Sequence, residues 1–340
     1  MKTEYKVHGQ IPQRKEYVDG ITAFVEERKK ACAKQRETRV LSGDIESLRQ
    51  AYIQTLGYPL NEYASMAGGT PSCASETVFE GKDIKIYRLQ LEVYQGLKLY
   101  GMLFVPEKVL EKNALMFALH GAKGSPECIG AMGEESTNYN SFVRRLLKNG
   151  AVVFAPQTLI WNEAHEGDGY DRVSLDLSLK QCGGSIVSLE LFCLKRALDY
   201  FCAQSWIDET RIGIAGMSYG GMYTLALSAI DTRIKATLCC GYFNDRTQIR
   251  FSDWAHFGQA SICLDAEQAM LILPRDLYIE VGKKDTTFPV ESALQEIEKL
   301  KKYAKQKGVD GHLTVRVHEG GHEVDKDNDG CFFMHEILKV

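Results

Sequence analysis

The sequence lacks the segments that direct a chain into or across a membrane. Its first twenty residues, MKTEYKVHGQIPQRKEYVDG, contain no apolar core of a signal peptide, and no uncharged apolar run approaches the length that spans a bilayer. The ten cysteines include no C-x-x-C pair of a zinc site and are too sparse for a disulfide scaffold. We therefore expect a cytoplasmic protein whose cysteines are reduced and mostly buried.

Clustered positive charge is also absent. The 41 Lys and Arg are scattered along the chain, and with 45 Asp and Glu the net charge is -4. Such a surface offers no basic stripe for nucleic acid and none for an anionic membrane. We expect a small, neutral or weakly polar ligand, no nucleic acid partner and no membrane partner. The oligomeric state is left open.

The composition is that of an ordinary globular protein. A chain of 340 residues, 44% hydrophobic and 25% charged, can form one large core or two modest ones. From about residue 12 to residue 56 apolar side chains recur at helical spacing among many charged ones. We therefore expect residues 1–75 to form a helical extension packed on a larger domain of residues 76–340.

The pattern changes to strands after the Gly- and Ser-rich stretch MAGGTPSCAS. The runs IKIYRLQLEVY and LKLYGMLFVP alternate apolar and polar residues on either side of Gln95-Gly96, which predicts a hairpin. Short apolar runs then alternate with amphipathic stretches; the runs are ALMFALH, AVVFAP, RIGIAG, IKATLCCG and DLYIEVG. This order is typical of an α/β fold, in which helices cover both faces of a mostly parallel sheet. Ligands bind beyond the carboxyl ends of such strands.

A serine stands between two glycines where one apolar run meets an amphipathic stretch. RIGIAG leads directly into MSYGGMYTLALSAI, which gives Gly216-Met217-Ser218-Tyr219-Gly220. At a strand-to-helix turn, G-x-S-x-G strains the serine backbone and exposes its hydroxyl at the helix N-terminus, where backbone N–H groups favour an oxyanion. The alternative is a glycine-rich turn needed only for packing. Ser218 is therefore the candidate nucleophile.

A serine needs a base to take its proton and an acid to orient that base. One recurrent chain order of this triad is Ser, then Asp or Glu, then His. Asp285 follows the run DLYIEVG, and His322 follows the run HLTVRV, so each comes just after the carboxyl end of a predicted strand. His318 is the rival base, and Asp285 could instead cap the following helix. We predict Ser218, Asp285 and His322 to be the catalytic residues.

A loop after another strand can complete the site. ALMFALHGAKGSPE places a His-Gly sequence directly after its apolar run. In such loops a backbone N–H joins the N–H of the residue after the nucleophile to bind an oxyanion. We expect the amides of Ala122 and Tyr219 to form this oxyanion hole. His120 is expected to be a structural hydrogen-bonding residue rather than a catalyst.

These loops together resemble a known superfamily. The HG loop, the GMSYGG elbow, the GKKDTTFP acid loop and the GGH base loop are similar to those of α/β hydrolases, in the branch of dienelactone-hydrolase-like and acetyl-xylan-esterase-like proteins. The resemblance covers about residues 80 to 340. It implies the α/β-hydrolase fold and a serine esterase that needs no metal or cofactor. Dienelactone hydrolases have a cysteine where Ser218 stands, so the resemblance favours a serine esterase over that specific reaction.

The acidic tail allows a second interpretation. From Asp325 to Glu336 the sequence DKDNDGCFFMHE fits the calcium loop of an EF-hand. Gly320-Gly321 disfavour an entering helix, and four residues after Glu336 are too few for an exiting one. We expect the acidic run to leave the histidine loop and cap a terminal helix through Asp327, Asn328 or Asp329. That helix would pack through its apolar side chains, which are Phe332, Phe333, Ile337 and Leu338.

Two further segments are expected to shape the pocket. Trp161 follows the run AVVFAP, and residues 241–275, with Trp254 and His256, separate two strands by more than a simple helix requires. We expect residues 241–275 to form a cap whose aromatics limit the acyl group and favour acetyl and propionyl esters. The alternative is that both segments are ordinary surface loops with partly buried aromatics.

The leading hypothesis for function follows from these residues. It is a carboxylic ester hydrolase that forms an acyl-serine and removes a short acyl group such as acetyl from a small molecule, with a sugar as a candidate carrier. An amidase or peptidase with the same triad is the nearest alternative. A non-catalytic hydrolase-like scaffold or a calcium-binding protein is the alternative from a different class.

Overall fold

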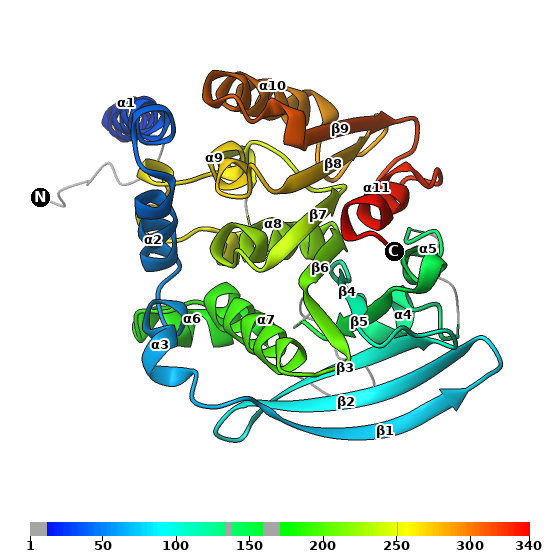
Figure 1. Cartoon of the computed structure of the whole chain (residues 1–340). Coiled ribbons are helices and arrows are strands. Elements are labelled where there is room, and N and C mark those ends of the chain that lie inside the picture. The colour runs from blue at the N-terminus through cyan, green and yellow to red at the C-terminus, as the bar shows by residue number, and fades with distance from the viewer. Residues whose placement is uncertain (1–11, 134–137, 159–170, 250) are drawn as a thin grey trace, which may run out of the picture.

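A computed structural model describes residues 12–133, 138–158, 171–249 and 251–340 (Figure 1). Its centre is a 9-stranded sheet in the order β1-β2-β3-β5-β4-β6-β7-β8-β9. The strands are β1 (Ser72–Glu80), β2 (Ile84–Tyr94), β3 (Leu97–Pro106), β4 (Asn113–Leu119), β5 (Val152–Pro156), β6 (Ile207–Met217), β7 (Ile234–Cys240), β8 (Asp276–Gly282) and β9 (Leu313–His318).

Most of the sheet is parallel, as predicted. Strands β5, β4, β6, β7, β8 and β9 run parallel, and β1, β2 and β3 form an antiparallel edge beside β5. The predicted hairpin is confirmed as β2 and β3, with Gly96 at φ 77° in its turn. Strand β1 was not predicted, because this edge strand is largely exposed and lacks a clear apolar alternation. The expected division after residue 75 falls inside β1.

Helices cover both faces of the sheet. In Figure 1 α7 to α10 lie along one face and α4, α5 and α11 along the other. The helices are α1 (Pro12–Ser42), α2 (Ile45–Leu56), α3 (Tyr63–Met66), α4 (Pro126–Ile129), α5 (Phe142–Leu146), α6 (Arg172–Gln181), α7 (Ile186–Cys202), α8 (Tyr219–Ile230), α9 (Asp265–Met270), α10 (Val290–Lys307) and α11 (Asp329–Leu338).

The central strands are apolar on both sides because both sides are covered. All seven residues of β4 are buried. Leu115 and Phe117 point into the core shared with α7 and α8, whereas Met116 and Ala118 point into the core shared with α11. Successive side chains of a strand face opposite ways, so a strand between two helical layers reads as one continuous apolar run.

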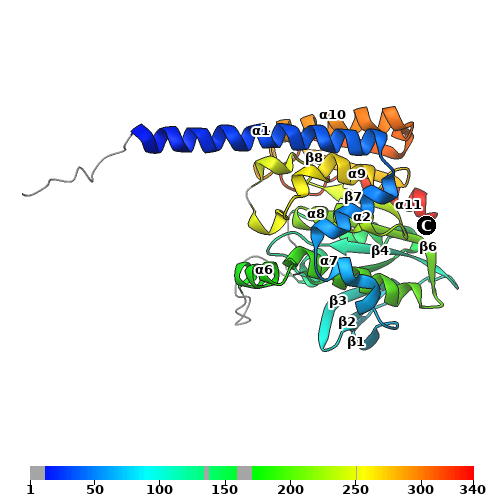
Figure 2. The same ribbon diagram turned by 90° about the vertical axis from the view of Figure 1, so that its left-hand side faces the viewer.

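The N-terminal helices lie outside the α7–α10 layer. Figure 2 shows α1 running along α9 and α10, with its first half extending beyond the rest of the protein. The buried guanidinium of Arg36 pairs with Glu267 at 3.1 Å. Arg49 of α2 donates hydrogen bonds to the carbonyl oxygens of Ala229 and Leu271. Within the described ranges, no helix is both long enough and apolar enough to cross a bilayer.

Candidate active site

Ser218 lies at a sharp turn between β6 and α8. Its backbone has φ 60° and ψ -119°, a conformation that costs a residue with a side chain about 1–3 kcal/mol. A Cβ on Gly216 would collide with the carbonyl of Gly220, and a Cβ on Gly220 would collide with that of Leu119. Both glycines of the motif are therefore required by close backbone contact. The turn presents the serine hydroxyl at the carboxyl edge of the sheet, at the N-terminus of α8.

The imidazole of His322 joins Ser218 to Asp285. Its Nε2 lies 2.8 Å from Oγ of Ser218, and its Nδ1 lies 2.8 Å from Oδ2 of Asp285. The side chain of Asp285 is 2% exposed and that of His322 is 21% exposed. If Nδ1 donates its proton to the carboxylate, Nε2 can accept the proton of the serine hydroxyl. This arrangement can activate a serine for attack on a carbonyl carbon.

Two backbone amides fix the Asp285 carboxylate. Its Oδ1 accepts hydrogen bonds from the N–H groups of Thr287, at 2.8 Å, and Phe288, at 2.9 Å. The other oxygen, Oδ2, faces His322. Helix α10 begins only at Val290 and has no side-chain cap. Asp285 therefore orders the loop before the helix, and the same bonds aim its second oxygen at the imidazole.

The loop that carries His322 packs tightly against the end of β8. A Cβ on Gly282 would collide with the carbonyl of Gly321, so the glycine at position 282 allows the loop to pack this closely. His318, the alternative base, is buried at the end of β9 and accepts the N–H of Gly320 at 3.1 Å. Within the described residues, no hydrogen bond joins it to the serine or the aspartate.

The HG loop after β4 lies against the serine. A Cβ on Gly121 would lie 3.2 Å from that of Ser218. The N–H of Gly121 is used by the hydroxyl of Tyr139, at 2.8 Å, a contact that the sequence did not predict. In the described part of the chain, no acceptor binds the amides of Ala122 or Tyr219. These are the two amides predicted to bind an oxyanion.

His120 has a structural setting. Its Nδ1 lies 2.8 Å from the carbonyl oxygen of Gly121, and its Nε2 accepts the backbone N–H of Thr158 at 3.1 Å. Burial lowers the pKa of this imidazole to about 4, so the ring is neutral near pH 7 and can both donate and accept. It connects the HG loop to the segment that follows β5, in agreement with the expected hydrogen-bonding role.

Trp254 lies behind the site instead of over it. Its side chain is buried, with its ring centroid 4.9 Å from that of Tyr219 and 6.0 Å from that of Phe288. The expectation that Trp254 overhangs the serine therefore differs from the structure. Residues 241–249 and 251–275 run through short turns and α9; Tyr242 and Phe243 are buried with the tryptophan, whereas Phe257 is fully exposed.

His256 and Trp161 are the other two residues expected to bind substrate. His256 is 9% exposed and lines a cavity of about 650 Å³ between the end of α2 and the start of α7. Burial lowers the pKa of His256 to about 3. The lining of this cavity includes none of the triad residues. Trp161 lies outside the described residues.

A buried polar network supports the residue after the nucleophile. The guanidinium of Arg172 pairs with Glu190 at 2.8 Å and with Asp253 at 3.1 Å, and it donates to the hydroxyls of Tyr219 at 2.7 Å and Tyr223 at 2.9 Å. These hydroxyls donate in turn to Asp253 and Glu190 respectively. Sequence reasoning missed this network, because its members come from four elements and share no local motif.

The acidic tail is organised around one guanidinium. Arg316 pairs with Asp325 at 3.1 Å and with Asp327 at 2.6 Å, and it lies 3.8 Å from Asp329. An EF-hand would direct these carboxylates at a cation, but α11 already begins at Asp329, inside the expected calcium loop. Across the four described ranges, no group of three His, Cys, Asp or Glu side chains could hold a metal ion.

The terminal helix packs largely as expected. Its N-cap is Asn328, one of the three residues predicted for this position, but Asn328 makes no side-chain capping bond. Phe333, Ile337 and Leu338 pack into the core on this side of the sheet, whereas Phe332 is 56% exposed. Met334 and His335 are buried as well. His335 is accommodated because its Nε2 bonds the carbonyl oxygen of Leu146 at 2.9 Å.

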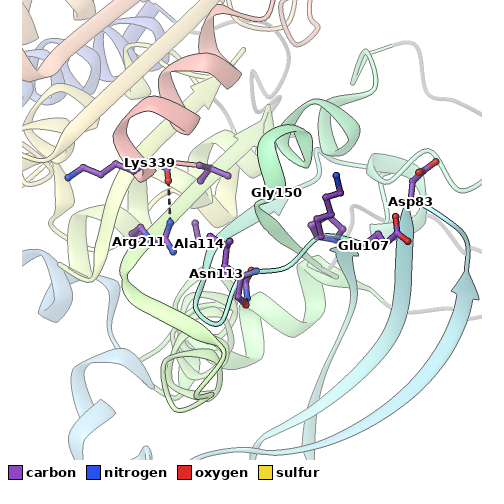
Figure 3. Close-up of a pocket in the computed structure, with 11 residues that line it drawn as sticks. Asp83, Glu107, Asn113, Ala114, Gly150, Arg211 and Lys339 are labelled. Atoms are coloured by element: carbon purple, nitrogen blue, oxygen red, sulfur yellow. Dashed lines mark hydrogen bonds between the residues drawn. The ribbon is translucent and has the colours of Figure 1, made fainter.

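A cavity of about 490 Å³ lies at the amino ends of the parallel strands, where β4 begins (Figure 3). The amide of Asn113 donates to the carbonyl oxygens of Leu110 and Trp206. Arg211 donates to those of Lys112 and Lys339. These polar groups already have protein partners, and the parallel strands direct their amino ends here. The lining of this cavity includes none of Ser218, Asp285 and His322.

Comparison with known proteins identifies the fold of this chain. Residues 194–238, which run from α7 through the serine turn into β7, match the model of the prolyl oligopeptidase family. A methylesterase superposes with a TM-score of 0.64 and 18% identity over 87% of this chain, which spans 63% of that protein. The chain has the α/β-hydrolase fold.

Two other structures agree with this fold. A candidate acetyl xylan esterase from Bacteroides fragilis has a TM-score of 0.62 and 13% identity, covering 89% of this chain and 88% of that one. A glucuronoyl esterase from Solibacter usitatus has a TM-score of 0.57 and 15% identity, covering 85% and 91% respectively. No curated protein sequence matches the chain significantly. At these identities the resemblance establishes the fold, and the activity must be argued from the site.

Proposed function

We propose that the protein is a serine hydrolase that cleaves carboxylic esters through an acyl-serine intermediate. The observation that carries this proposal is the hydrogen-bonded series Ser218–His322–Asp285, with 2.8 Å at each step. A serine held in a strained turn, with a base within hydrogen-bonding distance and an acid behind that base, has the three groups that acyl transfer requires. The reaction proposed here requires no metal or cofactor.

The proposed reaction has two halves. His322 Nε2 takes the proton of Ser218 as Oγ attacks the ester carbonyl, and the amides of Ala122 and Tyr219 stabilise the oxyanion. The alcohol then leaves with the proton from His322, and the acyl group remains on Ser218. A water molecule attacks the acyl-serine with His322 again as base, which releases the carboxylic acid and restores the enzyme. Asp285 holds the imidazolium in orientation throughout.

We further propose a short acyl group such as acetyl, with a carbohydrate as a candidate carrier. Support comes from structural neighbours named acetyl xylan esterase and glucuronoyl esterase. The substrate would be a small molecule, and the scattered charges of the chain suit a neutral one. A cytoplasmic location belongs to the same proposal, since all ten cysteines are free thiols.

An amidase or peptidase is the second candidate. The match to the prolyl oligopeptidase family favours it, but that match covers only residues 194–238. This segment is the serine turn and its supports, which esterases and peptidases share. The described residues before the sheet, 12–71, form the helices α1 to α3 and not the propeller that restricts substrate access in such peptidases.

Labelling and a substrate panel test the proposal. A fluorophosphonate should label Ser218 in the wild type and should label neither Ser218→Ala nor heat-unfolded protein. Matched p-nitrophenyl esters and p-nitroanilides of acetate, butyrate and octanoate then separate esterase from amidase activity. Esterase activity that is highest for acetate supports the proposal. Anilide hydrolysis at comparable rates would favour the amidase, and absence of both labelling and turnover would contradict both candidates.

A further inference from the structure

The first half of α1 exposes a stripe of large apolar side chains. Tyr17, Val18, Ile21, Phe24 and Val25 are 72%, 57%, 46%, 73% and 44% exposed respectively. They lie on the part of α1 that extends beyond the rest of the protein (Figure 2). Isolated exposed apolar residues are ordinary, but five within nine positions of one helix form a continuous surface. We call these five residues the α1 stripe.

The α1 stripe continues the face by which α1 binds its own chain. Cys32, Arg36 and Val40 of the second half are buried against the body. Val18 and Val25 precede Cys32 by steps of seven residues, so they lie on nearly the same side of the helix. One half of this face is thus covered by the protein, and among the described residues nothing covers the other half.

The spacing of the stripe is that of a coiled-coil seam. Tyr17, Ile21, Phe24 and Arg28 alternate by steps of four and three, as the a and d positions of a heptad do. Beside them is Gly20, which lowers helix stability by about 1 kcal/mol relative to alanine. A Cβ at Gly20 would meet nothing within 4 Å, so no packing inside the described chain requires this glycine. A second helix that packed closely against this position would require a glycine here.

We propose that the α1 stripe binds the same stripe of a second copy of this chain, with the two helices antiparallel. A parallel, in-register pair would set Arg14 against the partner's Arg14 and Arg28 against the partner's Arg28, which places like charges at both ends of the seam. The antiparallel pair instead sets Ile21 against the partner's Phe24, and Val18 near the partner's Val25. Arg28 then lies at the ring of the partner's Tyr17, where a cation–π contact is favourable.

The proposed contact is small. The seam from residue 14 to residue 28 is about 22 Å long at 1.5 Å per residue, or roughly two heptads. Such an interface lies at or below the lower end of stable protein contacts, so the dimer should dissociate in the micromolar range. The antiparallel arrangement also directs the two bodies to opposite ends of the helix pair, which avoids a clash between them.

Mass measurement by light scattering or sedimentation tests the dimer. At about 200 µM, well above a micromolar Kd, the wild type should have twice the 38.2 kDa mass of one chain and should approach that mass on dilution. Ile21→Glu and Phe24→Lys should each give the single-chain mass at every concentration. Ala23→Glu adds a negative charge, as Ile21→Glu does, but on another face of α1, and it should leave the dimer intact. Circular dichroism and ester hydrolysis should be unchanged in all three variants.

A mixing experiment tests the orientation. In the antiparallel pair residue 21 faces residue 24 of the partner, so equimolar Ile21→Glu and Phe24→Lys should regain the double mass through one Glu–Lys layer and one intact layer. Wild type that stays a single chain at about 200 µM would overturn the proposal. A dimer that survives both substitutions would overturn the assigned surface, and failure of the mixed variants to associate would overturn the antiparallel register.

Discussion

The ring of Phe288 lies 5.5 Å from the imidazole of His322, and on it stacks the indole of Trp254, at 6.0 Å with an interplanar angle of 6°. Trp254 in turn contacts Tyr219, the residue after the nucleophile. A continuous aromatic column therefore links the residue beside Ser218 to the base. Since the column is buried except near the imidazole, its contribution is to position the catalytic loops rather than to contact substrate.

Replacement of Trp254 by alanine should destabilise the protein without changing its acyl preference. Removing a buried tryptophan leaves a large cavity and costs about 3–5 kcal/mol. Urea unfolding measures this loss, and the p-nitrophenyl ester panel measures the preference. Trp254→Phe retains part of the column and should lose less stability. If Trp254→Ala kept full stability and gained activity on octanoyl esters, the indole would line the acyl pocket after all.

Ser218→Ala should fold normally and lose on the order of 10⁴- to 10⁶-fold in kcat, since the nucleophile acts as a unit with its base. Stability should stay nearly unchanged, because alanine leaves the strained backbone in place and removes no buried packing. The measurement is ester turnover together with thermal unfolding. Activity within tenfold of the wild type would remove Ser218 from the proposed role.

The two histidines near the end of β9 should differ sharply. His322→Ala removes the group bonded to both the serine and the aspartate, so turnover should fall about as far as in Ser218→Ala. His318→Ala should retain most of its turnover, with any loss explained by reduced stability of its buried site. Asp285→Asn should lose about 10⁴-fold, because an amide holds the imidazole in the wrong tautomer. The reverse order of the histidines would make His318 the base.

The parts of the fold that could be predicted are those with a local cause. Strands such as β4 are apolar throughout because helices cover both faces, and Ser218, Asp285 and His322 each follow such a strand. The missed parts have no such local cause. Strand β1 is exposed and pairs only with β2, so its residues carry little pattern. Trp254 is buried partly by the rings of Tyr219 and Phe288, which come from two other segments, and no spacing in its own segment reveals these contacts.

Calcium should not stabilise the protein. Arg316 already neutralises Asp325 and Asp327, and a cation would have to displace this guanidinium before it could collect the carboxylates. We expect the same melting temperature with millimolar calcium and with chelator, since a ligand shifts stability only if it binds the folded state. Arg316→Gln serves as the control that frees the carboxylates. A rise in the wild type that disappears in Asp327→Ala with Asp329→Ala would establish a calcium site.

Glu280 makes the free energy of unfolding depend on pH. Its buried carboxylate on β8 accepts the backbone N–H of Asp325 at 2.9 Å. Burial raises the pKa of Glu280 from 4.5 to about 7. Between these two values the folded protein holds a proton that the unfolded chain releases. This carboxyl therefore reduces the free energy of unfolding as the pH rises from 4.5 through 7.

Glu280→Gln should remove this pH dependence, because an amide cannot ionise but its side-chain oxygen can still accept the N–H of Asp325. The difference in unfolding free energy, variant minus wild type, should become more positive between pH 5 and pH 8, by up to about 3 kcal/mol. Urea unfolding at several pH values measures it. Glu298→Gln changes a side chain that is 68% exposed and should show no such trend. An equal difference at both ends of the range would mean that Glu280 does not titrate there in the folded protein.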